Sequence, residues 1–231
     1  MNKNILFIGA LVFLSMCCFQ VGNVFSYEMK EYFPLSEGDS WIYSVVEDNA
    51  DISQEEIAVK GLEEVGGINT VKVYHGEEYY CYAIDKEGVK NFKIFDEGEY
   101  DLFDPPLVKY PNINLGETQQ YSVTRIRYGA DGVKKSSEVE EYSVKLENIE
   151  DVKVLAGNFK DCLKFVEVRS RTKPNGTKQK ETCKIYLAPG VGKIEEACSE
   201  IEVTPEGKSS TFGSVKSLVS AEVGGKQVEA Y

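Results

Sequence analysis

The feature that most constrains how this chain can fold is the recurrence of large apolar residues at every second position from residue 40 onward. The pattern is clearest in three segments, Trp41–Val45, Tyr142–Leu146 and Cys183–Leu187. Successive side chains of a β-strand point to opposite faces, so this period predicts strands with one buried face. Further strands are predicted over residues 54–62, 68–75, 78–85, 88–95, 119–128, 161–171, 193–203 and 211–223.

Turn-forming residues separate these segments, as in Gly66-Gly67, Pro174-Asn175-Gly176 and Gly224-Gly225. Outside the first 26 residues, no segment has the apolar period of about 3.6 residues that marks an amphipathic helix. The sequence therefore predicts an all-β fold, in which antiparallel meanders form a strongly curved sheet, a half-barrel or a sandwich.

A faint internal repeat divides the predicted domain into two halves, residues 31–104 and 105–223. In each half a glycine precedes an aromatic strand residue at the same spacing, in Gly38–Tyr43 and in Gly116–Tyr121. An internal duplication would give two similar meanders, with the proline-rich stretch 104–111 as the joint between them.

Residues 1–26 are predicted to be a signal peptide, because the apolar run Ile5–Phe19 is uncharged but shorter than a membrane-spanning helix needs. Cleavage after Ser26 would leave residues 27–231 as one antiparallel β domain. Two alternatives stay open: Cys17 could carry a lipid anchor, or the leader could be retained. No later apolar segment approaches about 18 residues, so no transmembrane span is expected in the mature chain.

The composition and motifs exclude several classes of function. The 231 residues include 38 acids and 26 bases, and the formal charge of -12 repels nucleic acid. Glycine-rich phosphate loops are absent from the sequence. His75 is the only histidine, and at a predicted strand end it is expected to be a surface hydrogen-bonding residue. We therefore predict no catalytic, cofactor-binding or metal-binding residues, and a deep pocket where His75 meets several acids would contradict this prediction.

Two clusters of charge stand out. The stretch Asp96–Asp104 is rich in carboxylates, and we interpret it as a solvated loop, with calcium binding as the alternative. A basic run flanks the predicted turn at Asn175-Gly176, and its members would share one solvated face or contact an acidic partner or lipid headgroups. These cations are Arg169, Arg171, Lys173, Lys178 and Lys180.

Four cysteines lie beyond the predicted leader, an even number that permits disulfides in an exported protein. If Pro189–Gly192 is a hairpin turn, residues whose numbers sum to 381 face each other, and Cys183 and Cys198 meet this condition. The sequence predicts a disulfide between them and leaves the pairing of Cys81 and Cys162 open. Reduced cysteines are the alternative, and zinc is disfavoured because no Cys-x-x-Cys motif is present.

Three motifs together resemble a known family. They are Tyr32–Tyr43, Val154–Lys164 and Tyr186–Ile194, and they are similar to the signatures of exported bacterial β-domains of unknown function, the TapB-like group (domain-of-unknown-function 3108-like). The resemblance spans about residues 31–204 and implies a secreted or lipid-anchored β protein without an assigned reaction. It supplies no catalytic residues.

The physical role of these motifs is expected to be structural. Gly38 would adopt a positive φ before the first strand, and Trp41 and Tyr43 would anchor the sheet from its buried face. The alternative is that Trp41 and the tyrosines line a groove for a ligand.

The sequence as a whole predicts an exported, non-enzymatic β-domain of the cell envelope that binds or scaffolds an unknown envelope protein. The alternative is a periplasmic carrier of an apolar ligand such as a lipid. A carrier needs a cavity of several hundred Å³ lined by apolar side chains, whereas a scaffold fills its interior.

Overall fold

A computed structural model describes residues 27–48 and 52–228, and within these residues the fold is all-β, as predicted. One three-residue 3₁₀ helix, η1 (Met29–Glu31), precedes the strands. In the described part of the chain, no helix is long and apolar enough to cross a lipid bilayer. The strands are β1 (Ser40–Glu47), β2 (Ser53–Val65), β3 (Ile68–His75), β4 (Glu78–Asp85), β5 (Gly88–Asp96), β6 (Glu99–Pro111), β7 (Thr118–Tyr128), β8 (Lys134–Val154), β9 (Gly157–Thr172), β10 (Lys178–Ala188), β11 (Gly192–Val203), β12 (Ser209–Val223) and β13 (Lys226–Gln227).

The strands form a single closed ring. Each of the first twelve strands pairs antiparallel with the next along the chain, and β12 pairs with β1, for example at Trp41 and Ala221. The result is a closed 12-stranded antiparallel barrel, rather than the half-barrel or sandwich expected from the sequence. Closure satisfies the backbone groups that a free sheet edge would expose.

The proline-rich stretch 104–111 is a strand and not a linker. It forms the second part of β6, so the boundary between the two predicted halves falls inside one strand. Pro105 and Pro106 lie between the two stretches in which β6 is paired with β5, and proline can occupy such a position because it has no ladder hydrogen bond to donate there. The internal duplication itself stays a prediction.

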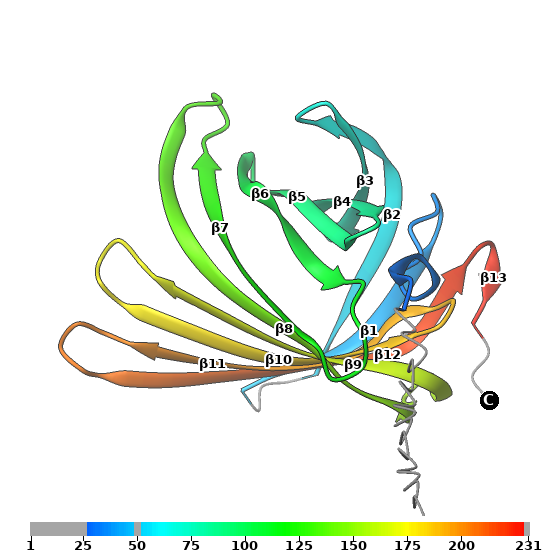
Figure 1. Cartoon of the computed structure of the whole chain (residues 1–231). Helices are drawn as coiled ribbons and strands as arrows, with labels where there is room; N and C mark the ends of the chain where they lie inside the picture. The colour runs from blue at the N-terminus through cyan, green and yellow to red at the C-terminus, as the bar shows by residue number, and fades with distance from the viewer. Residues whose placement is uncertain (1–26, 49–51, 229–231) are drawn as a thin grey trace, which may run out of the picture.

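The barrel is strongly flared at the end where β7 and β8 are joined. Figure 1 shows the β7–β8 hairpin rising away from the hairpins β9–β10 and β11–β12, which extend to the left of the view. At the opposite end of the barrel lies the N-terminal segment, in dark blue, near β13. The two ends therefore differ in shape.

The N-terminal segment closes the narrow end of the barrel. Met29 is buried, and its backbone N–H donates a hydrogen bond to Oδ1 of Asn112, which follows β6 (2.9 Å). The backbone carbonyl of Glu31 accepts a hydrogen bond from the N–H of Gly190 in the β10–β11 turn (2.7 Å). Gly38 has a φ of 94°, as predicted. Gly192 also needs to be glycine, because its φ is 98° and an added Cβ would lie 3.3 Å from Pro34 Cδ.

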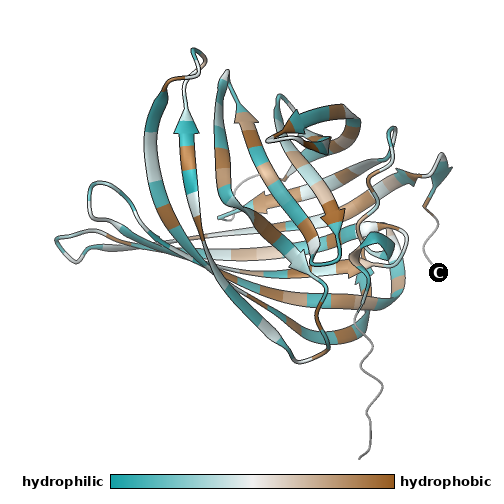
Figure 2. Ribbon diagram, turned by 45° about the horizontal axis from the view of Figure 1, so that its top comes forward, coloured by the Kyte–Doolittle hydropathy of each residue, from teal (hydrophilic) through white to brown (hydrophobic). Residues whose placement is uncertain are grey.

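The inward-facing side chains change from apolar to charged along several strands, starting from the narrow end. Every second residue of a strand points to the same face of the sheet. In β9 one face therefore carries Leu163, Phe165, Glu167, Arg169 and Arg171. The first two are fully buried and apolar, whereas the last three are charged. Figure 2 shows the resulting bands of hydrophobic and hydrophilic residues along the ribbons. The interior thus has an apolar half and a charged half.

Candidate functional site: an interior cavity

A cavity of about 210 Å³ lies inside the barrel, where the apolar half meets the charged half. Its lining combines aromatic rings with charged side chains, from strands that are far apart in the sequence. The aromatic residues are Phe33, Trp41, Tyr43, Tyr80, Tyr82 and Tyr110, and the ionisable residues are Glu55, His75, Glu78, Lys109, Lys193, Glu196 and Lys216.

His75 lies in this cavity together with Glu55, Glu78 and Glu196, so its prediction as a surface residue is wrong. A pocket in which His75 meets several acids also argues against the expectation that the chain has no site residues. The His75 side chain is 17% exposed, and its Nδ1 lies 2.8 Å from Glu55 Oε1. Burial lowers the pKa of His75, although the hydrogen bond with Glu55 acts in the opposite direction. With its Nδ1 proton donated to Glu55, the neutral ring presents Nε2 as an acceptor. The strand end was predicted correctly, but His75 shares the inward face of β3 with the buried Val73 and lies opposite the buried Ile57.

Three ammonium groups in and around the cavity each pair with a carboxylate. Lys216 Nζ lies 2.7 Å from Glu55 Oε2, and Lys193 Nζ lies 2.7 Å from Glu196 Oε2. In each pair, the attraction between the two charges offsets the cost of removing them from water, a cost that an isolated buried charge would bear alone. Lys109 pairs in the same way with the buried Glu167, at 2.7 Å.

The cavity carboxylates differ in their ionisation. Burial opposes the charged form of Glu55 and Glu196, but the neighbouring cations outweigh it and lower both pKa values to about 2. Glu78 forms no ion pair with a described residue, and burial raises its pKa despite a hydrogen bond with Tyr80. The cavity therefore contains permanently charged acids beside one acid that is easier to protonate.

The stability of the fold should depend on these low pKa values. A carboxylate with a lowered pKa stabilises the folded state above its usual pKa of 4.5, and this contribution is lost as the pH falls towards 2. We expect the urea concentration at the unfolding midpoint to decrease as the pH is lowered from 4.5 to 2. Glu196→Gln should make the midpoint depend less on pH over this range. The exposed Glu56→Gln is the control, and equal profiles for both variants would contradict the assignment.

The charged half of the interior continues from the cavity toward the flared end. Asp101 accepts two hydrogen bonds from each of Arg125 and Arg127, and Arg171 pairs with Glu138 (2.8 Å) and the fully buried Glu140 (3.2 Å). These inward-facing ion pairs line the flared part of the barrel with mutually compensated charges.

Two sequence interpretations of charge are corrected by this arrangement. Most of the acidic stretch Asp96–Asp104 belongs to β6 and not to a loop, and Asp101 is buried there against two arginines, whereas Asp96, Glu97 and Asp104 are exposed as predicted. The basic run does not share one face. Arg171 points inward with Gln179, whereas the exposed Lys178 and Lys180 flank Gln179 on the opposite face of β10.

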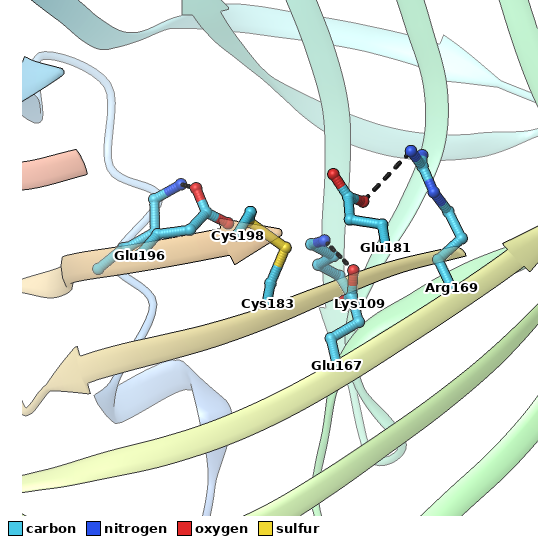
Figure 3. The surroundings of a disulfide bond; sticks show 8 residues. Lys109, Glu167, Arg169, Glu181, Cys183, Glu196 and Cys198 are labelled. Carbon is cyan, nitrogen blue, oxygen red and sulfur yellow. Dashed lines mark hydrogen bonds and ion pairs between the residues drawn. A yellow bond between two sulfur atoms is a disulfide. The ribbon is translucent and has the colours of Figure 1, made fainter. Parts of the chain in front are cut away.

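Cys183 and Cys198 face each other on β10 and β11 and form a disulfide with a Cα–Cα distance of 4.1 Å. Figure 3 shows the bond near Glu181 and Glu167, and Glu181 pairs with Arg169 at 3.2 Å. Both sulfur atoms lie within 4.8 Å of the Glu181 carboxylate, but they are bonded to each other and offer no thiolate. The predicted disulfide is therefore present in the structure.

Cys81 and Cys162, whose pairing the sequence left open, are separate buried thiols. Burial raises the pKa of each thiol to about 11, so both stay protonated and unreactive at neutral pH. Cys17 and the predicted leader, residues 1–26, lie outside the described residues.

The sequence analysis missed the charged residues of the cavity, although a signal was present. Glu55 precedes Ile57 and Val59 on the inward face of β2, and Glu196 follows Ile194 on the inward face of β11. A charge in phase with buried apolar residues is costly without a partner. A charged residue at an inward-facing position of a strand therefore indicates that part of the barrel interior is charged.

Comparisons with known proteins identify no family. No family model matches the chain, and no curated protein matches it. The resemblance to the TapB-like group therefore stays a prediction.

Two solved structures are similar to this chain. A "putative lipoprotein" from Parabacteroides distasonis has a TM-score of 0.45 and 15% identity, and the match covers 82% of this chain and 97% of that one. The hypothetical lipoprotein YmcC from Escherichia coli has a TM-score of 0.44 and 8% identity, over 79% of this chain and 87% of that one.

Proposed function

We propose that this protein is an exported, non-enzymatic binding protein of the cell envelope, and that its barrel holds one small polar ligand in the interior cavity. The observation that carries the proposal is the cavity itself, which combines aromatic rings with Glu78, His75 and lysine groups. Concave sites of this kind, with apolar walls and a few convergent polar groups, are the usual places where proteins bind small molecules.

The cavity favours a polar ligand over the lipid expected of an apolar carrier. Its volume of about 210 Å³ is below the several hundred Å³ that a carrier needs. Seven ionisable side chains line it, and an acyl chain would leave their remaining hydrogen-bonding groups unpaired. The apolar half of the barrel is filled by side chains such as Leu146, Phe165 and Leu218.

Two features support export. The uncharged apolar run Ile5–Phe19 has the length of a signal-peptide core, and cleavage after Ser26 would release a chain that begins at Tyr27. The disulfide between Cys183 and Cys198 is of the kind that persists in oxidising compartments. Lipidation at Cys17 is the alternative to free export.

The proposal is tested by thermal unfolding in the presence of small polar compounds, namely amino acids, amines, carboxylates and monosaccharides, and of long-chain fatty acids. A ligand at about 100 times its dissociation constant adds about 2.7 kcal/mol of stability. We expect at least one polar compound to raise the melting temperature. Val73→Phe, which fills the cavity, should abolish this rise, whereas Val139→Phe on the outer face of β8 should not. Stabilisation by fatty acids alone, or equal responses of both variants, would contradict the proposal.

One observation favours a second candidate, a hydrolase. Glu78 has a raised pKa and Glu196 a lowered one in the same cavity, and such divided carboxylates can serve as acid and base. Chemical conversion of any stabilising compound during the same experiment, lost in Glu78→Gln, would support the enzyme.

A further inference from the structure

The charges around the cavity do not balance. Four carboxylates, Glu55, Glu78, Glu167 and Glu196, lie in or beside it, against the three ammonium groups of the lysines. Each lysine is paired with one carboxylate at 2.7 Å. The carboxylate that remains is Glu78.

Among the residues that the structure describes, no nearby cation is free to neutralise Glu78. Arg125, which influences it electrostatically, is already bound to Asp101 and lies 3.6 Å from Glu140. His75 is held at Glu55 and burial favours its neutral form. Asp96, an exposed residue outside the cavity lining, adds a negative charge that also raises the pKa of Glu78. The surroundings of Glu78 therefore carry an excess of one or more negative charges.

Aromatic rings flank this carboxylate. Tyr80 follows Glu78 on the same face of β4, and its ring stacks on Tyr82 with centroids 6.0 Å apart. The ring of His75 packs against Tyr80 at 4.7 Å. A cation beside an aromatic face gains electrostatic energy, and it gains more where water is excluded.

We propose that the ligand of this cavity carries a protonated or quaternary amine, which binds between the Glu78 carboxylate and the Tyr80 ring. The inference rests on the proposed function, because it names the chemical class of the ligand for the same site. A single positive charge compensates the unpaired carboxylate, and the aromatic rings contact its alkyl groups. A ligand with a single negative charge at this position would meet the Glu78 carboxylate and be repelled.

The test uses three probes of matched size and different charge: choline, its neutral isostere neohexanol, and the anion tert-butylacetate. Isothermal titration calorimetry of the mature protein measures their dissociation constants. We expect choline to bind at least tenfold more tightly than neohexanol, and tert-butylacetate to bind most weakly. Glu78→Gln should remove the preference for choline, while Glu77→Gln, at the exposed neighbouring turn position, should keep it.

A second variant keeps the test decisive if Glu78→Gln does not fold. Tyr80→Leu removes the aromatic face and should weaken choline binding about tenfold while leaving neohexanol nearly unchanged. Equal affinities for choline and neohexanol, or tighter binding of the anion, would overturn the inference. Failure of the proposed function would give a different result: for every probe and polar compound, binding or thermal stabilisation would be the same in the wild-type protein and in Val73→Phe.

Discussion

Replacing Glu140 with alanine is expected to lower the free energy of unfolding by about 3 kcal/mol. Glu140 is fully buried in β8, where it accepts a hydrogen bond from Tyr142 and pairs with Arg171. The Oε1 atom that pairs with Arg171 also lies 3.6 Å from a guanidinium nitrogen of Arg125. Removing the carboxylate leaves two guanidinium groups, each only 16% exposed, with one compensating charge fewer. This loss of stability lies at the low end of the range for broken buried ion pairs, because Asp101 still pairs with Arg125 and Glu138 still pairs with Arg171.

The measurement is urea unfolding at neutral pH, with the slope of the transition monitored. Glu141→Ala is the matched control, since Glu141 is the next residue of β8 and points to solvent. Its effect should stay within about 0.5 kcal/mol, as is usual for surface substitutions. Similar midpoints for the two variants would show that the interior charges contribute little to stability.

Removing the disulfide is expected to cost about 3 kcal/mol, the value of the chain-entropy model for a closed loop of about 15 residues. The bond joins residues that are 15 positions apart in the sequence. The double variant Cys183→Ser with Cys198→Ser should unfold at a lower urea concentration than the wild-type protein. A thiol reductant should lower the wild-type midpoint to a similar degree and leave the double variant unchanged.

Alkylation gives an independent readout of the same bond. Without reductant, the denatured mature protein should react at Cys81 and Cys162, and reductant should add the two remaining thiols. Full alkylation before reduction, or a wild-type midpoint insensitive to reductant, would refute the disulfide's stabilising role.

The prediction of this disulfide was correct for a reason that the sequence did not contain. Next to the turn, Ala188 faces Gly192 and Leu187 faces Lys193, so the facing numbers there sum to 380. A register shift between Tyr186 and Leu187 changes the sum to 381, and only then does Cys183 face Cys198. A bulge inserts one extra residue into a strand, and a simple turn rule cannot foresee it.

The strands themselves were largely predictable. Segments 68–75 and 78–85 coincide with β3 and β4, because alternating side chains and flanking glycine turns are local properties of the sequence. The strands that the sequence did not predict are β6 and the two-residue β13, and in β6 prolines and carboxylates argued against a strand. There the buried pairing of Asp101 with arginines of β7 overrides the local preference.

By itself, the sequence determined the all-β class and the positions of most strands, since each follows from neighbouring residues. Only the tertiary structure decided that the sheet closes, that a register shift sets Cys183 opposite Cys198, that His75 lines a cavity, and that Glu78 alone among the cavity acids has no cation partner in the described part of the chain. The hydrogen bond from Trp41 to Val191 spans 150 residues. Contacts of such sequence separation are fixed by closure of the whole sheet and leave no local periodicity to read.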